Sequence, residues 1–356
     1  MSKKHNFSAG PCILPQDVLK KASEAIINFN NDNLSLIEIS HRSKPFVNVM
    51  EKARNLVKEL LDVPTGYSIL FLQGGASLEF LMAPINLMKK DGGKSAYLNT
   101  GSWSKKAIAE ARNFGEVIIV GDSSDENYKY IPKEYYIPGD VDYFHCTSNN
   151  TIFGTQIKDF PKVPSLMVCD MSSDIFSRRI DVSKFDLIYA GAQKNMGPAG
   201  TTLVIVKDEI LGKTGRKIPT MLDYNTHILK ESMFNTPPVF AVYVSMLTLE
   251  WLKAHGGVEW IEEVNERKAK MLYSEIDRNP LFTGVANKED RSTMNVTFNL
   301  TNTSILDKFD VLCQQAGISG LKGHRSVGGY RASIYNALPL ESVEVLVNVM
   351  KNTENN

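Results

Sequence analysis

Short apolar runs alternate with amphipathic stretches over the middle of this chain, and this alternation limits the folds that the chain can adopt. The apolar runs predict buried strands at 67–72, 94–99, 117–120, 143–147, 166–170, 185–189 and 201–206. Helical spacing of apolar residues between some of these runs predicts helices, one at 78–88 and another that ends at 114. Strands and helices in this order favour an α/β fold with a mostly parallel sheet that helices cover on both faces.

Length and composition bound the number of domains. With 356 residues, 43% of them hydrophobic, the chain can bury a large core and a second, smaller one. Prolines disfavour a helix near the amino terminus, so we predict an extended segment at 1–15. A glycine-containing break at 254–257 separates a predicted large domain, 16–256, from a smaller α+β domain, 257–356.

Charge and cysteine content exclude several classes of function. The 40 basic residues balance 40 acidic residues, so no long-range field recruits nucleic acid or an anionic membrane. No apolar run approaches membrane-spanning length, and the amino terminus has no apolar leader-like stretch. Cys12, Cys146, Cys169 and Cys313 lack C-x-x-C spacing, which favours buried thiols over disulfides or a zinc site. We therefore expect a cytoplasmic protein without a metal.

Lys194 stands where lysines are uncommon, in a small-residue loop between two predicted core strands. A partly desolvated lysine loses stabilisation of its charged form, so its pKa falls and its free amine can attack a carbonyl. This is the requirement for a Schiff-base lysine. For the residue taken alone, a solvated lysine in a glycine-rich turn is at least as good an interpretation.

Asp170 ends the apolar run at 166–170. A carboxylate at the end of a buried strand is costly unless it meets a positive partner, and such strand ends are where open α/β sheets bind ligands. Asp170 and Lys194 together fit pyridoxal 5′-phosphate (PLP), in which the Asp keeps the pyridinium nitrogen protonated and the Lys carries the aldehyde carbon. Alone, Asp170 is also explained as a helix N-cap before Ser172 and Ser173.

Four separated motifs resemble those of the phosphoserine aminotransferases, class V members of the fold-type I PLP-dependent enzymes. They are N-F-S-A-G-P at 6–11, S-H-R-S-K at 40–44, G-A-Q-K-N at 191–195 and K-G-H-R-S-V-G-G-Y-R-A-S at 322–333. Because the motifs keep the order found in that family and the match runs from about residue 6 to about residue 350, chance is a poor explanation. The resemblance implies a fold-type I architecture with PLP as the cofactor.

The resemblance also implies which residues bind the cofactor. Besides Lys194 as the catalytic residue and Asp170, they are Ala76, Ser77, Trp103, Thr151, Gln193, Asn235 and Thr236. The glycine-rich turn at 73–77 would cradle the cofactor phosphate at a helix start, and Trp103 would stack on the ring. The pair at 235–236 would reach the cofactor phosphate of another subunit, which implies a homodimer with two shared active sites. Without the resemblance, core packing and plain turns explain these residues.

The substrate-binding residues that the resemblance implies are His41, Arg42, His324, Arg325 and Arg331. A planar guanidinium suits a carboxylate, so Arg331 would bind the substrate α-carboxylate. Arg42, helped by His41, would hold the distal carboxylate, and His324 with Arg325 would bind the substrate phosphate from the neighbouring subunit. Many relatives carry an arginine where Ser77 stands, and it reaches that phosphate. This contact is missing or replaced here.

The implied reaction is reversible amino transfer from L-glutamate to 3-phosphohydroxypyruvate, giving O-phospho-L-serine and 2-oxoglutarate, in serine biosynthesis. Relatives also act on a phosphorylated threonine derivative on the route to pyridoxine, and the sequence leaves this activity open. Another class V enzyme, such as a serine–pyruvate or alanine–glyoxylate aminotransferase, is an alternative that needs no phosphate cluster. A nucleotide-binding dehydrogenase lacks support because no G-x-G-x-x-G fingerprint is present. A non-catalytic PLP-binding protein is a further alternative.

Overall fold

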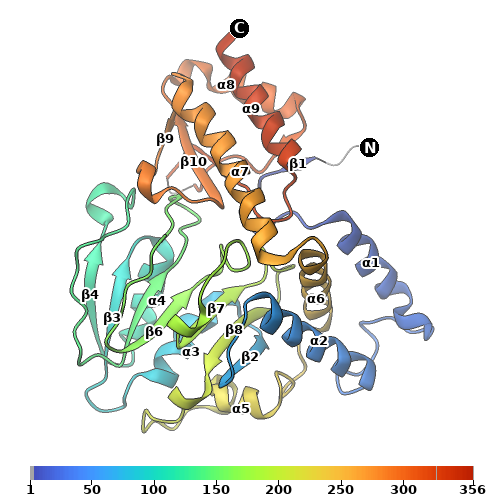
Figure 1. Ribbon diagram of the computed structural model, residues 1–356, viewed down its shortest axis with the longest axis vertical. Helices are drawn as coiled ribbons and strands as arrows, with labels where there is room; N and C mark the ends of the chain where they lie inside the picture. Colours follow the sequence, from blue (N-terminus) through green and yellow to red (C-terminus); the bar gives the residue numbers. More distant parts are fainter. Residues whose placement is uncertain (1–3, 326, 356) are drawn as a thin grey trace.

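A computed structural model of the chain describes residues 4–325 and 327–355, and a seven-stranded sheet forms its centre (Figure 1). The strands lie in the order β2, β8, β7, β6, β5, β3, β4. From β7 to β4 all neighbours run parallel, whereas β8 is antiparallel to β2 and β7, which confirms the predicted mostly parallel sheet. The strands are β2 (Tyr67–Leu72), β3 (Lys94–Asn99), β4 (Glu116–Asp122), β5 (Tyr143–Thr147), β6 (Leu166–Asp170), β7 (Leu187–Gly191) and β8 (Thr202–Lys207).

Helices cover both faces of this sheet, because alternate residues of a strand point to opposite faces. Ile69 and Phe71 of β2 share one core with residues of the first group of helices, and Leu70 and Leu72 share another with residues of the second group. The first group is α1 (Gln16–Ile27), α2 (Lys44–Leu60) and α6 (Val239–Ala254), and the second is α3 (Gly75–Leu87), α4 (Ser102–Ala111) and α5 (Tyr224–Leu229).

The C-terminal part of the chain has a hydrophobic core of its own. It contains an antiparallel sheet in the order β12, β10, β9. The helix α7 (Gly257–Arg278) connects the two parts, because Ile261 near its start belongs to the core of the large sheet and Leu272 further on to the C-terminal core (Figure 1). The other elements are β9 (Phe282–Gly284), β10 (Asn295–Leu300), α8 (Leu306–Gln315), β12 (Tyr330–Ser333) and α9 (Leu340–Asn355).

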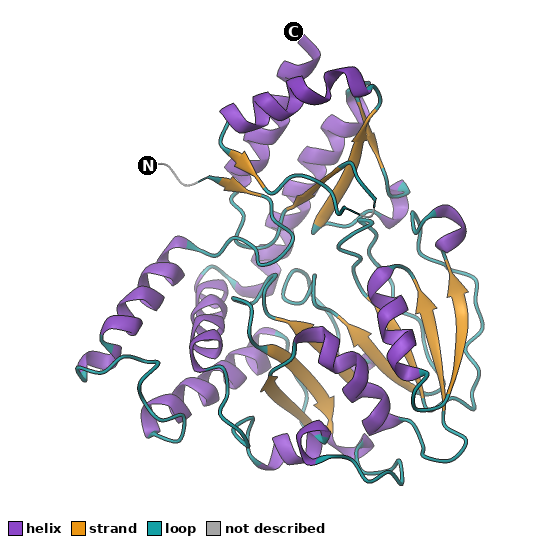
Figure 2. Cartoon of the chain, turned by 180° about the vertical axis from the view of Figure 1, so that it is seen from behind, coloured by secondary structure: helices purple, strands orange, loops and turns teal. Residues whose placement is uncertain are grey.

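The amino-terminal segment lies with the C-terminal part, not with the sheet that follows it in the sequence. Strand β1 (His5–Asn6) pairs in parallel with β11 (Ile318–Ser319), as Figure 2 shows beside the amino terminus. Phe7 is fully buried in the C-terminal core. The segment predicted as extended is therefore anchored by a strand pair and by a core side chain.

The helix α3 differs from its predicted start. It begins at Gly75 and not at residue 78. Gly74 and Gly75 have φ angles of 91° and 64°, which residues with a Cβ rarely adopt, so the chain turns sharply out of β2 and the helix starts at once. Ala76 and Ser77 consequently lie in the first helical turn. Among residues 4–325 and 327–355, none of the helices is long and apolar enough to cross a membrane.

Candidate active site

A cavity of about 330 Å³ lies at the carboxyl ends of β5 and β6 and is lined by both parts of the chain. The site residues that the sequence predicted divide into two sets. Those that line the cavity are Ala76, Ser77, Trp103, Thr151, Asp170, Gln193, Lys194, His324 and Arg331. The others, which are not among the residues lining it, are His41, Arg42, Asn235, Thr236 and Arg325.

Lys194 reaches the cavity from the loop between β7 and β8. Its Nζ donates a hydrogen bond to Thr151 Oγ1 at 2.7 Å and lies 5.7 Å from the centre of the Trp103 ring. Burial lowers the pKa of Lys194 to about 8, although the carboxylate of Asp170 opposes this effect. The Lys194 amine is therefore easier to deprotonate than that of a solvated lysine. A reactive lysine, as predicted from the sequence, requires this property.

Asp170 is the last residue of β6 and is almost completely buried. Its Oδ1 accepts a hydrogen bond from the backbone N–H of Ser172 at 2.9 Å, but a turn and not a helix follows. Burial raises the pKa of Asp170, and the hydrogen bonds from Ser172 and the charge of Lys194 oppose this rise. The interpretation as a helix N-cap is therefore wrong, and the carboxyl group faces the same cavity as the lysine.

The first turn of α3 provides an anion-binding edge to the cavity. Gly75, Ala76 and Ser77 all line it, and the unpaired N–H groups of a helix start carry the positive end of the helix dipole. Trp103, in the first turn of α4, forms an adjacent wall. This edge suits a phosphate group next to an aromatic ring.

Two candidate substrate residues come from the C-terminal part. Arg331, on β12, donates from one terminal nitrogen to the backbone oxygen of Thr151 at 3.3 Å. His324 lines the same chain's cavity, whereas the sequence placed it in the site of the neighbouring subunit. The pKa of His324 is lowered by burial first and then by the charges of Arg331, Arg325 and Lys106. The mouth of the cavity is consequently rich in positive charge.

Of the predicted residues outside the cavity, Arg325 is exposed on the C-terminal part, and the other four belong to the large part. Arg42 and Thr236 are exposed, and His41 and Asn235 are partly buried. The backbone oxygen of Thr236 accepts a hydrogen bond from Gln73 Nε2 at 2.7 Å, next to the glycine-rich turn before α3. Within one chain these residues are therefore not brought together with Lys194.

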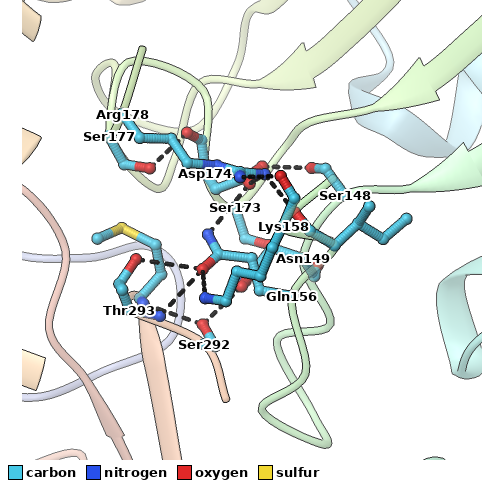
Figure 3. Close-up of polar contacts among 12 residues, drawn as sticks. Ser148, Asn149, Gln156, Lys158, Ser173, Asp174, Ser177, Arg178, Ser292 and Thr293 are labelled. Atoms are coloured by element: carbon cyan, nitrogen blue, oxygen red, sulfur yellow. Dashed lines mark hydrogen bonds and ion pairs between the residues drawn. The ribbon is translucent and has the colours of Figure 1, made fainter. Parts of the chain in front are cut away.

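Beside the cavity, a second buried carboxylate organises a polar network (Figure 3). Asp174 accepts hydrogen bonds from Ser148, from Gln156 Nε2 at 3.3 Å and from Arg178 at 3.1 Å. Gln156 Oε1 in turn accepts from Lys158 Nζ at 2.7 Å and from the backbone N–H of Thr293 at 3.2 Å. The network ties the segments after β5 and β6 to the segment before β10.

Sequence reasoning missed a second link between the two parts. Asn149 lines the cavity, and its Nδ2 donates to Ser173 Oγ and to Asn295 Oδ1, both at 2.8 Å. Asn295 also donates to Ser333 Oγ at 3.0 Å, two residues from Arg331. The only signal in the sequence was the polar run Ser148-Asn149-Asn150-Thr151 after a buried strand, of which the prediction used Thr151 alone.

The residues that line the cavity fit PLP. An amine and a carboxyl group share the cavity with a helix start that suits a phosphate. In the part of the chain that the structure describes, Thr147 Oγ1 and Trp103 Nε1 at its wall are buried without a hydrogen-bond partner. Buried polar atoms without partners are uncommon in proteins, so these two atoms indicate room for a polar ligand.

Comparisons with known proteins identify the family of this chain. Residues 4–346 match the family described as aminotransferase class V. The chain is 68% identical to a phosphoserine aminotransferase of Flavobacterium psychrophilum over 99% of both chains. It is also similar to two solved structures, the phosphoserine aminotransferase of Bacillus circulans subsp. alkalophilus (41% identity, 99% of both chains, TM-score 0.96) and the PLP-bound enzyme of Trichomonas vaginalis (37% identity, 98% and 100% of the chains, TM-score 0.93).

These similarities are not confined to the motifs around Lys194 and Arg331. They cover almost the whole chain, and they include the fold as well as the sequence. The chain belongs to the class-V aminotransferases, a PLP-dependent family, and within it to the phosphoserine aminotransferases.

Proposed function

We propose that this chain catalyses reversible amino transfer from L-glutamate to 3-phosphohydroxypyruvate, which gives O-phospho-L-serine and 2-oxoglutarate and serves serine biosynthesis. One observation carries the proposal: a lysine of lowered pKa, a strand-end carboxyl group and a guanidinium line one cavity. When bound, PLP supplies the electron sink for the reaction. The similarity to phosphoserine aminotransferases over nearly the full chain supports this substrate pair over pyruvate or glyoxylate.

Lys194 is the catalytic residue in this proposal. Its amine moves the proton at the substrate Cα, and a pKa of about 8 suits a general base at neutral pH. Asp170 stabilises positive charge at the far side of the cavity. Ala76 and Ser77 hold the cofactor phosphate, and the proposed contacts to the rest of the cofactor are those of Trp103, Thr151 and Gln193.

The substrate is held by its two ends. Arg331 binds the α-carboxylate, and its bond to the Thr151 backbone supports its position. Arg42, helped by His41, holds the distal carboxylate of glutamate, and His324 and Arg325 bind the phosphate of the other substrate. Together these side chains form one positive cluster that accepts either group.

We propose that a homodimer completes this site. His41, Arg42, Asn235 and Thr236 then serve the partner's cavity, which agrees with their absence from their own. Large apolar side chains that precede these two pairs in the sequence are exposed, and a partner subunit would cover them. They are Ile27, Leu34, Ile37, Leu229 and Phe234.

Two further assignments accompany this proposal. We assign residues 16–256 to a large PLP-binding domain and residues 257–356 to a small domain, which the two separate hydrophobic cores support. We also assign the protein to the cytoplasm. The four cysteines, of which three are buried and none has C-x-x-C spacing, support this, because they do not form the framework of a disulfide-rich secreted protein.

Half-reactions test the proposed function. Glutamate added to the PLP-loaded enzyme should remove the visible absorption of the cofactor, and 3-phosphohydroxypyruvate should restore it. Pyruvate and glyoxylate are the controls, and restoration by either of them at the same rate would contradict the substrate assignment. The same assay with phosphohydroxythreonine would decide whether the chain also takes the pyridoxine-pathway substrate.

A further inference from the structure

Lys106 is a cation beside two cavity-lining residues, Trp103 and His324, and the sequence assigned it no role. It lies on α4, one turn after Trp103, and its Nζ is 4.8 Å from the centre of the Trp103 ring. Lys194 Nζ lies 5.7 Å from the same ring centre, so the two amines are at most 10.5 Å apart. Lys106 does not line the cavity itself, but it lies against the ring of Trp103, which does.

The charge of Lys106 also reaches a residue on the other part of the chain. It acts on His324, as do the charges of Arg331 and Arg325. Among residues 4–325 and 327–355, Lys106 forms no ion pair with a carboxylate, and its amine lies over the ring of Trp103. Its charge is consequently available to an anion at the cavity mouth.

The adjacent edge of the cavity, at the first turn of α3, lacks a charged side chain. Ser77 lines the cavity but contributes only a hydroxyl group. A phosphate dianion that binds at the cavity mouth near His324 needs more positive charge than a carboxylate does, because it carries almost two charges at neutral pH. A flexible lysine one turn from Trp103 can supply this charge as a point cation.

We propose that Lys106 is a specificity-determining residue that binds the substrate phosphate. This role rests on the proposed function, since it requires a phosphorylated substrate. Lys106 strengthens binding of the phosphorylated substrate more than binding of glutamate, and it takes no part in proton transfer.

The neighbouring residue Lys105 provides a matched control. It is an exposed lysine on the same helix turn, but its charge acts on Asp122, at the end of β4, and not on His324. Lys105→Met and Lys106→Met thus remove the same group from adjacent positions that face different neighbours. Both residues are exposed, so both variants are expected to fold, and thermal unfolding would verify this.

Steady-state kinetics of the PLP-loaded enzyme test the role. Lys106→Met should raise KM for O-phospho-L-serine roughly tenfold, the effect of one lost charge-assisted hydrogen bond, with kcat nearly unchanged and a smaller change for glutamate. Lys106→Arg should retain most of the affinity, and Lys105→Met should behave as the wild type. Ser77→Arg added to Lys106→Met should restore a low KM, because it returns a cation to the other wall.

Binding of inorganic phosphate gives a readout without turnover. Calorimetry with the PLP-loaded protein should show weaker phosphate binding in Lys106→Met than in Lys105→Met. Equal KM values and equal phosphate binding in the two variants would overturn the role of Lys106 and leave the proposed function intact. A wild-type enzyme that does not act on O-phospho-L-serine would instead overturn the proposed function and this role with it.

Discussion

Lys194 Nζ and Thr151 Oγ1 are 2.7 Å apart, which joins the catalytic loop between β7 and β8 to the segment that follows β5. The backbone oxygen of the same threonine accepts a hydrogen bond from Arg331. One residue thus contacts both the proposed base and the proposed carboxylate-binding group. A change at Thr151 is therefore expected to affect the chemistry and substrate binding to different extents.

Thr151→Val should lower the rate of the glutamate half-reaction about tenfold, because the Lys194 amine loses the hydrogen bond to the threonine hydroxyl group that positions it. KM for glutamate should change less, since the backbone oxygen that contacts Arg331 remains. Stopped-flow absorbance would measure both values. Thr151→Ser keeps the hydroxyl group and is the control, and an equal loss in the two variants would contradict the assigned contact.

Lys194→Ala should abolish the covalent link to PLP and lower turnover by at least a factor of about 10², since general bases contribute on the order of 10²–10⁴ in rate. Borohydride reduction followed by peptide mass spectrometry should find the pyridoxyl group on Lys194 in the wild type. Lys158, whose amine also has a lowered pKa, is the reference position. A label on Lys158 and not on Lys194 would contradict the assignment.

The pKa of Lys194 predicts how the cofactor-free protein takes up PLP. Only the free amine reacts with the aldehyde, and the amine is protonated below its pKa of about 8. The rate of uptake, followed by absorbance, should therefore rise with pH and level off above about pH 8. A rate that continued to rise to about pH 10, the ordinary range for lysine, would show that burial does not lower this pKa.

Glu79 predicts a pH dependence of stability. It is buried beneath the sheet, its Oε2 accepts a hydrogen bond from Tyr224 at 2.6 Å, and burial raises its pKa to about 8. The folded state therefore holds a proton that the unfolded state has lost above about pH 4.3, so stability should fall as pH rises from there to about 8. Urea unfolding at several pH values would measure this slope, and Glu79→Gln should flatten it. If stability depended on pH equally in Glu79→Gln and in the wild type, Glu79 would be ionised in the folded protein.

Arg178 and Asp174 form a largely buried ion pair, so removing one partner leaves a charge without compensation. Arg178→Met should lower the free energy of unfolding by roughly 3 kcal/mol. Arg179→Met is the neighbouring control, because Arg179 pairs with Glu262 at the surface, where ion pairs contribute little. Equal urea midpoints for the two variants would show that Asp174 is satisfied without Arg178.

The sequence predicted those parts of the fold and site that depend on local pattern. Strand-end position alone indicated Asp170, and the small-residue loop between two apolar runs indicated Lys194. Both lie in the cavity because the ends of parallel strands meet at one edge of a sheet. The start of α3 was placed too late because its glycines, which weaken helices, here form the turn that begins one.

The remaining parts depend on contacts between distant segments. The pairing of Asn149 with Asn295 joins residues 146 positions apart, and neither has a local pattern that identifies the other. The position of His324 depends on how the C-terminal part packs against the large sheet. Helix periodicity placed Lys106 on α4 but gave no indication that its charge acts on a loop of that other part.

The pairing of β1 with β11 also constrains the order of events during synthesis on the ribosome. The strand His5–Asn6 is made first but has no partner until Ile318 and Ser319 have left the exit tunnel. The large sheet, whose strands all lie between residues 67 and 207, can assemble long before that. The strand β1 is thus made before the large sheet but reaches its native place after it, and it must stay without its β11 partner while residues 7–317 are translated.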